Sequence, residues 1–167
     1  MALEIERKFL VTDRSFIQEA LRCAKIRQYY LPEENVGVTR RIRFMDQRAY
    51  LTQKGRSSCS GWIREEEERE ISLEEARAIL QTSTFEGEIE KTRYYIPYEG
   101  FLWEVDLFHG SLDGLIIAEV ELSRVEDFPP LPPWIGAEVT GDARYYNSVL
   151  SRMCQDELRS LIGTKDN

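Results

Sequence analysis

Residues 3–10 read Leu3-Glu4-Ile5-Glu6-Arg7-Lys8-Phe9-Leu10, and the fold follows from how these residues alternate. Successive side chains of an extended strand point to opposite faces, so Glu4, Glu6 and Lys8 share one face, whereas Ile5 and Phe9 share the other. Burying unpaired charge costs many kcal/mol, so the charged face cannot enter a dry core. It must face solvent or a wet, charged interior, and the rest of the chain decides between the two.

Composition and charge narrow the classes of protein. The 167 residues, 42% of them apolar, predict one globular domain over residues 1–167 with its own core. No long apolar run indicates a membrane span or a signal peptide, so we expect a cytoplasmic protein without a membrane partner. The net charge of -8 opposes nucleic-acid binding, so an anionic ligand must be held by focused cations or by a metal ion. Three scattered cysteines and one histidine predict neither disulfides, nor a zinc site, nor a Ser-His-Asp triad.

Strands dominate the predicted secondary structure. After the first strand, runs with one apolar and one polar or charged face recur along the chain. Charged side chains spaced i, i+2 mark most of them. The predicted strands are Ile26–Leu31, Val36–Met45, Arg48–Lys54, Trp62–Ile71, Glu88–Ile96, Phe101–Phe108 and Leu115–Leu122.

Helices and connections are expected between these strands. Apolar residues at helical spacing predict a helix over Asp13–Ala24. Ser72 and Glu75 form a capping box ahead of a second helix that ends near residues 82–84, and Asp142 caps a final helix that runs to Leu161. The Gly- and Ser-rich segment Gly55–Gly61 predicts a mobile hairpin turn, and residues 129–133 predict a rigid Pro-rich connector.

The charged pairs are segregated by sign. Two pairs are cationic (Arg41 with Arg43, Lys91 with Arg93), and four are anionic (Glu4 with Glu6, Glu66 with Glu68, Glu104 with Asp106, Glu119 with Glu121). Surfaces that serve solubility intersperse the signs instead. Closing the strands into an antiparallel barrel of about eight would place the charges inside and the apolar side chains outside, under the helices. The predicted fold class is therefore α+β, mainly antiparallel β, with an eight-stranded closed barrel, a charged interior and helices packed outside.

A wet interior of this kind can bind two kinds of group, a metal cation and a phosphate. Carboxylates are oxygen ligands for a hard divalent cation, whereas Arg and Lys side chains donate to phosphate oxygens. A metal-bound polyphosphate satisfies both walls.

A family resemblance runs through the whole chain in order. Its motifs are Glu4-x-Glu6-x-Lys8, Gln28-Tyr29-Tyr30-Leu31, Arg41-x-Arg43, Thr52-x-Lys54, Arg64-x-Glu66-x-Glu68, Glu90-Lys91-Thr92-Arg93-Tyr94, Trp103-Glu104-Val105-Asp106, Glu119-Val120-Glu121, and Glu138-Val139-Thr140 followed by Arg144-Tyr145 and Asn147. With these motifs the chain resembles the CYTH superfamily, also called triphosphate tunnel metalloenzymes. It departs from the family pattern at Tyr29, where relatives often have Gly, and at Arg69, where an apolar residue would suit the outer face.

The resemblance implies an eight-stranded tunnel that binds a triphosphate, with a set of residues for each role. The metal, Mg²⁺ or Mn²⁺, would be held by Glu4, Glu6, Glu119 and Glu121, with Asp106 as a further ligand. The phosphates would contact Lys8, Arg41, Arg43, Lys54, Lys91 and Arg93. Lys8 and Tyr30 would handle the attacking water and are the predicted catalytic pair. Glu66, Glu68 and Glu104 are further tunnel residues.

The resemblance also implies a reaction. Short bacterial members of the family are usually inorganic tripolyphosphatases, so we expect metal-dependent hydrolysis of a phosphoanhydride bond, with a small-molecule triphosphate as the partner. Two alternatives stay open: a class IV adenylate cyclase or a thiamine or nucleoside triphosphatase of the same superfamily, and a polyphosphate-binding module that does not turn over. The sequence leaves monomer and homodimer equally open.

Overall fold

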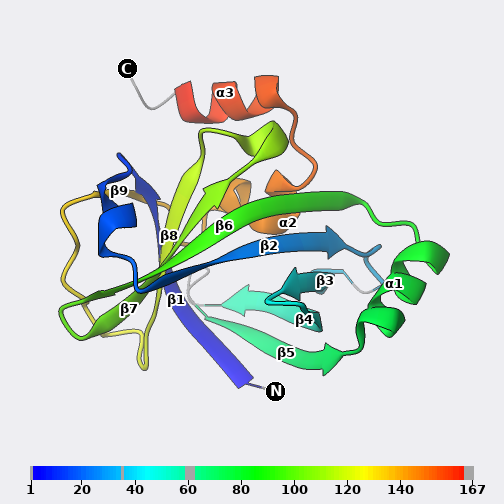
Figure 1. Cartoon of the computed structure of the whole chain (residues 1–167). Coiled ribbons are helices and arrows are strands. Elements are labelled where there is room, and N and C mark those ends of the chain that lie inside the picture. Colours follow the sequence, from blue (N-terminus) through cyan, green and yellow to red (C-terminus); the bar gives the residue numbers. More distant parts are fainter. Residues whose placement is uncertain (1, 35, 59–62, 164–167) are drawn as a thin grey trace.

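The computed structural model describes residues 2–34, 36–58 and 63–163 (Figure 1). Over these residues the chain forms nine strands, three α-helices and short 3₁₀ turns. The strands are β1 (Ala2–Val11), β2 (Arg22–Tyr30), β3 (Thr39–Met45), β4 (Arg48–Ser58), β5 (Ile63–Ile71), β6 (Gly87–Tyr98), β7 (Phe101–Phe108), β8 (Ile116–Glu121) and β9 (Ile135–Glu138). The helices are α1 (Leu73–Thr82), α2 (Asn147–Leu150) and α3 (Gln155–Gly163). No helix in the described part of the chain is long and apolar enough to cross a membrane.

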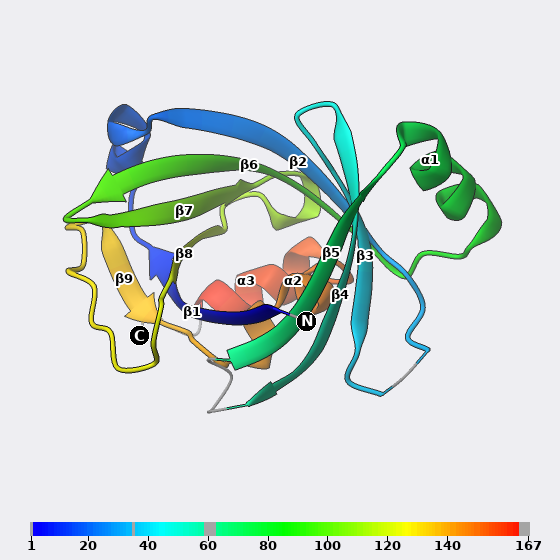
Figure 2. The ribbon, with the colours of Figure 1, turned by 90° about the horizontal axis from the view of Figure 1, so that it is seen from below.

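The sheet closes on itself. Its strand order is β5-β4-β3-β2-β6-β7-β8-β1-β9, and every pairing is antiparallel. An additional pairing of Ala2–Ile5 with residues 63–66 joins β1 to β5 and completes the ring, which Figure 2 shows from below. The predicted eight-stranded antiparallel barrel is therefore confirmed. A ninth strand, β9, which the sequence did not predict, lies outside the ring along the edge of β1.

The pleat sorts apolar from charged side chains as predicted. On β7, Trp103 and Val105 are fully buried on the outer side, where they belong to an apolar cluster with Phe9, Phe16 and Trp134. Their neighbours Glu104 and Asp106 point to the interior, where both pair with Arg93. Apolar burial under the outer segments thus fixes the register that turns the charges inward.

Helix α1 covers one side of the barrel outside β4 (Figure 1). The predicted cap is present, because the Ser72 hydroxyl accepts a 2.9 Å hydrogen bond from the Glu75 N–H. Ala76 is fully buried in a cluster with Leu31, Ile42, Ala49 and Ile71.

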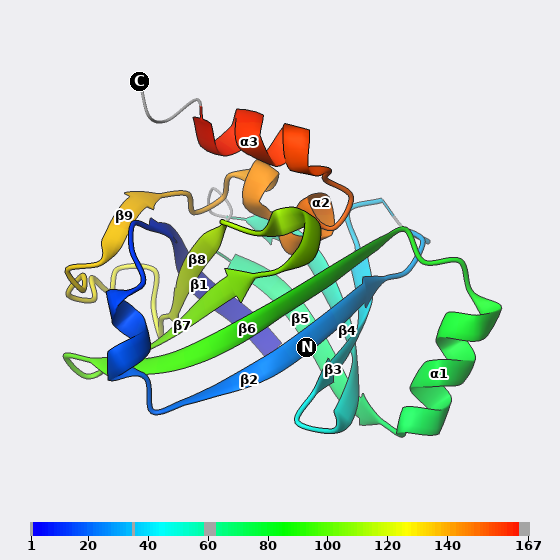
Figure 3. The same cartoon turned by 45° about the horizontal axis from the view of Figure 1, so that its top comes forward.

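Helices α2 and α3 lie together over one end of the barrel, as Figure 3 shows. Their side chains Leu150, Leu158 and Leu161 join an apolar cluster that includes Ile89 and Phe108 of the barrel strands. The C-terminal segment therefore covers that end of the interior rather than only its outer wall.

Two predicted helices were wrong in extent. Residues 13–24 contain only a 3₁₀ turn, Ser15–Glu19, because β2 already begins at Arg22 and pairs with β6 from its first residue. The final helix begins only at Asn147, because Tyr146 is extended (φ -68°, ψ 135°), and a turn between Leu150 and Gln155 divides it into α2 and α3.

The predicted Gly-rich turn was also placed too early. Strand β4 continues through Gly55 to Ser58. Its register against β5 shifts between Lys54 and Ser57. Residues 59–62, which include the predicted end of the turn and Trp62, lie outside the described residues.

Candidate functional site

The barrel encloses a cavity of about 870 Å³, lined from all eight strands of the ring. Every predicted site residue except Asp106 lines it: Glu4, Glu6, Lys8, Tyr30, Arg41, Arg43, Lys54, Glu66, Glu68, Lys91, Arg93, Glu104, Glu119 and Glu121. Alternation along each strand brings these side chains together although they come from distant parts of the sequence. Their individual roles stay predictions.

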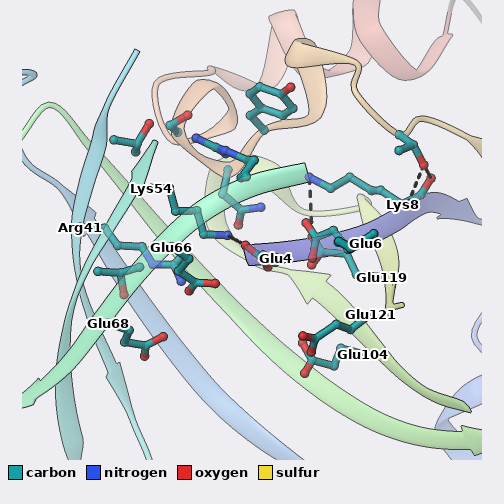
Figure 4. A pocket seen from close by; sticks show the side chains of 18 of the residues that line it. Glu4, Glu6, Lys8, Arg41, Lys54, Glu66, Glu68, Glu104, Glu119 and Glu121 are labelled. Atoms are coloured by element: carbon teal, nitrogen blue, oxygen red, sulfur yellow. Dashed lines mark hydrogen bonds and ion pairs between the residues drawn. The ribbon is translucent and has the colours of Figure 1, made fainter. Parts of the chain in front are cut away.

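Carboxylates gather on the wall formed by β1, β7 and β8. Glu6 lies opposite Glu121, and Glu104 lies opposite Glu119, in the strand register. Figure 4 shows Glu6 beside Glu119, with Glu121 and Glu104 together farther along. Burial, together with the charges of Glu119 and Glu4, raises the pKa of Glu6 well above its usual range. These carboxylates therefore lie close enough together for the charge of one to disfavour the charge of the next.

A second group of carboxylates surrounds Lys54. Its Nζ lies 2.9 Å from Glu4 Oε2 (Figure 4). Burial disfavours the charged form of Glu4, but Lys54 outweighs burial and leaves the pKa of Glu4 at about 2. Burial and the neighbouring Glu4 raise the pKa of Glu66 to about 7. Glu4 is thus the ionised member of this group, and Glu66 is its titrating member.

The cationic wall comes from β3 and β6. Arg41, Arg43, Lys91 and Arg93 are all at most 9% exposed. Burial, followed by the like charges of Arg41 and Arg93, lowers the pKa of Arg43 to about 9. The buried Nε of Arg41 has no hydrogen-bond partner among the described residues. A buried guanidinium in this state is suited to an anionic ligand, because an unmet donor is costly.

Asp106 lies behind this wall and not on the cavity surface. Its two oxygens accept from Lys91 Nζ at 2.7 Å and from Arg93 Nε and Nη2 at 2.8 and 3.0 Å. Although burial opposes ionisation, Arg93 and Lys91 hold the pKa of Asp106 well below its usual range. This geometry suits a residue that fixes two cations better than it suits the predicted metal ligand.

The predicted catalytic pair, Lys8 and Tyr30, is buried. Lys8 Nζ lies 3.6 Å from Glu119 Oε1 and donates to the Tyr145 carbonyl at 3.3 Å. Burial favours the neutral amine, but the charges of Glu119 and Glu6 outweigh it and raise the pKa of Lys8. Lys8 is therefore an ammonium. The Tyr30 hydroxyl accepts a 2.9 Å hydrogen bond from Gln28, which leaves its own proton available to a ligand.

Two uncharged residues of the site were not assigned a role from the sequence. Gln28 is fully buried and connects Tyr30 to Arg43, whose Nε donates to Gln28 Oε1 at 2.9 Å. Asn147, at the start of α2, accepts from Lys91 Nζ at 2.9 Å. The position of Gln28, two residues before Tyr30 on the same strand face, was the available signal, whereas no periodicity points to Asn147.

The donor set fits a hard divalent cation. Within the described ranges no three Asp, Glu, His or Cys side chains converge into a ready-made metal site. Nevertheless, several carboxylates share one wall of the cavity, and after burial the like charges of Glu119 and Glu4 contribute to the raised pKa of Glu6. Carboxylate oxygens without thiolate or imidazole are the ligands of Mg²⁺ and Mn²⁺ rather than of softer metals.

Comparison with known protein families gives one match across most of the chain. Residues 2–146 match the CYTH domain. The matched range includes all nine strands of the described structure and every predicted site residue.

Characterised relatives and a solved structure agree with this match. An inorganic triphosphatase of Acetivibrio thermocellus is 42% identical over 150 residues, which are 90% of this chain and 94% of the relative. An inorganic triphosphatase of Nitrosomonas europaea is 37% identical over 153 residues, which are 89% and 96% of the two chains. A crystal structure of an inorganic triphosphatase, 33% identical, superposes with a TM-score of 0.64 over 92% of this chain and 97% of that one.

Proposed function

The chain belongs to the CYTH domain family, and from that premise we propose that it is an inorganic triphosphatase that hydrolyses tripolyphosphate inside its barrel. The observation that carries this proposal is one cavity lined by both a cationic wall and a carboxylate wall. In this reaction water attacks a terminal phosphorus, one P–O–P bond breaks, and phosphate and pyrophosphate leave.

The cationic wall would hold the substrate. The proposed phosphate donors are the four residues of this wall, Arg41, Arg43, Lys91 and Arg93, together with Lys54 of β4. Because these donors come from strands of one barrel, the triphosphate would be oriented before the reaction. The unpartnered Nε of Arg41 is the first donor we assign to a phosphate oxygen. Asp106 would keep Lys91 and Arg93 in place without contacting the substrate.

The carboxylate wall would hold the metal, which we propose to be Mg²⁺ or Mn²⁺. The proposed ligands are Glu4, Glu6, Glu119 and Glu121. The same cavity is also lined by Glu66, Glu68 and Glu104, whose carboxylates would add to the negative charge around the metal. When bound, the metal would neutralise phosphate charge and lower the pKa of a bound water. Lys8 and Tyr30 would contact the attacking water through Nζ and the phenolic hydroxyl.

We further propose that the partner is a small molecule only and that residues 1–167 act as one cytoplasmic unit.

A substrate assay tests the function directly. Tripolyphosphate, ATP and thiamine triphosphate are compared side by side, and released phosphate and pyrophosphate are measured for each. We expect tripolyphosphate to give both products in equal amounts at the highest kcat/KM. A cyclase would instead release pyrophosphate from ATP without phosphate, and binding without turnover would identify a polyphosphate-binding module.

The metal requirement gives the first prediction. Excess chelator should abolish phosphate release, and added Mg²⁺ or Mn²⁺ should restore it, because an anionic substrate beside a carboxylate wall requires a divalent cation between them. Full activity in chelator would contradict the proposal.

The ligand assignment gives the second prediction. Glu6→Gln and Glu119→Gln should each lower metal-supported kcat/KM by roughly 100-fold or more, because each removes a charged oxygen ligand. Glu99→Gln is the control, since Glu99 lies in the turn between β6 and β7 at φ 49°. Equal losses in all three variants would indicate misfolding rather than a lost metal ligand.

A further inference from the structure

The edge of β1 changes partners around Lys8. In the described part of the chain, the register of β5 against β1 covers residues 2–5, and β9 pairs with Phe9 and Val11. Lys8 lies between the two stretches, at the point where neither strand supplies a continuous ladder. Its peptide N–H and C=O therefore depend on individual groups of the segment that follows β9.

A closed ring of hydrogen bonds supplies those groups. The Lys8 N–H donates to Thr140 Oγ1 at 2.9 Å, and the Lys8 carbonyl accepts from the Val139 N–H at 2.8 Å. The Thr140 hydroxyl donates to Glu138 Oε2 at 2.7 Å. Arg7 then donates to both oxygens of Glu138, from Nε at 2.9 Å and from Nη2 at 2.7 Å. Because Arg7 precedes Lys8 in the chain, the ring closes through their shared peptide bond.

The ion pair that completes the ring is well supported. The Arg7 side chain is only 12% exposed, and its guanidinium lies 5.1 Å from the centre of the Phe9 ring. The hydrogen bond from Arg7, followed by that from Thr140, lowers the pKa of Glu138 despite its partial burial. Glu138 is therefore ionised and available to orient the Thr140 hydroxyl at neutral pH.

The same segment also reaches the other end of Lys8. The Tyr145 carbonyl accepts a hydrogen bond from Lys8 Nζ at 3.3 Å, and the centre of the Tyr146 ring lies 5.5 Å from the same Nζ. Residues 138–146 thus contact both the backbone and the ammonium of Lys8. A displaced backbone at this position would move the ammonium relative to Glu119 and the cavity.

We propose that Thr140 and Glu138 are positioning residues that fix Lys8 for catalysis, with Arg7 holding Glu138 in turn. This proposal rests on the proposed function and on the catalytic role of Lys8. Neither Thr140 nor Glu138 is required to touch the substrate, and the Arg7–Glu138 pair lies on the outside of the barrel. The ion pair on the outer surface of β1 thus restrains the Lys8 side chain inside the barrel, through the Thr140 hydroxyl.

Kinetics of Thr140 variants test this role. Thr140→Val keeps the size but removes both hydrogen bonds, so kcat for tripolyphosphate should fall roughly 10-fold or more while KM stays within about twofold, since small displacements of catalytic groups cost large factors. Thr140→Ser should recover most of kcat. Thr12→Val is the matched control: the Thr12 hydroxyl donates to the Trp134 carbonyl at 3.2 Å beside β9, away from Lys8, and its loss should leave kcat unchanged.

A double-mutant cycle with Lys8→Ala separates positioning from general stability. If Thr140 acts through Lys8, Thr140→Val should lower kcat no further in the Lys8→Ala background. An equal loss in both backgrounds, or an effect matched by Thr12→Val, would overturn the proposal. A wild type that releases no phosphate from tripolyphosphate would instead refute the proposed function. A Lys8→Ala variant with wild-type kcat would remove the catalytic role of Lys8, and the positioning role with it, but would leave the triphosphatase activity standing.

Discussion

At the scale of single residues, spacing predicted the charged members of the site, the family resemblance alone pointed to Tyr30, and the other uncharged members were assigned no role. Arg41 and Arg43 stand out in sequence because two cations at spacing i, i+2 in an apolar strand have few explanations besides a wet interior. Gln28 and Asn147 carry no such signal, since an amide is tolerated on any polar surface. Thr140 appeared in the Glu138-Val139-Thr140 motif but without a role, because its hydrogen bond with Lys8 joins segments more than a hundred residues apart.

Arg41 and its neighbour provide the residue-scale prediction. Arg41→Ala should weaken tripolyphosphate binding by roughly 10- to 100-fold, because a charged hydrogen bond contributes about 1.5–3 kcal/mol. Arg40 alternates to the outer face, where its Nη1 pairs with Glu34 Oε1 at 2.9 Å, so Arg40→Ala should leave binding nearly unchanged. Titration of each variant with substrate in the presence of chelator measures binding without turnover. Equal effects would show that net charge, not position, governs affinity.

At the scale of elements, alternation predicted the ring strands, but two other patterns misled. Residues 13–24 have helical spacing, yet pairing of Arg22 to Tyr30 with β6 stabilises a strand that begins within this segment, at Arg22. Strand β9 is too short for its pattern to be recognised, and it exists because β1 leaves an edge to pair. Tertiary contacts decided both cases, and single-segment patterns do not contain them.

The close approach of β9 to β1 gives the element-scale prediction. A Cβ at Gly136 would lie 2.9 Å from the Leu10 carbonyl oxygen, which belongs to the backbone and has little room to move. Gly136→Val should therefore destabilise the fold by roughly 1–3 kcal/mol, as overpacking usually does. Gly163→Ala, where a Cβ meets nothing within 4 Å, is the control and should not lower the melting temperature. A Gly136→Val protein as stable as wild type would show that β9 separates from β1 without cost.

At the scale of the whole molecule, the segregated walls couple stability to ligand binding. Metal and tripolyphosphate at about 100 times their dissociation constant should add roughly 2.7 kcal/mol to the free energy of unfolding, or roughly 5–10 °C in melting temperature. Arg43→Ala should reduce this shift, because Arg43 faces the cavity and is 9% exposed. Thermal melts with and without ligand measure it, and the absence of any shift at saturation would exclude the tunnel as the binding site.

The closure of the ring between β1 and β5 has a consequence for synthesis of the protein. The carboxylate wall unites Glu4 and Glu6 near the start of the chain with Glu119 and Glu121, whereas both cationic strands emerge from the ribosome before β8 does. Until β8 has been translated, β1 of a nascent chain therefore has only one of its two ring neighbours, β5, with which it makes a short contact. Pairings between such distant segments form slowly, because loop closure must precede the contacts that reward it. Strand β1, which is translated before the other described strands, is thus among the last to be fixed in the sheet, and until then its unpaired edges are open to chaperones and to association with other nascent chains.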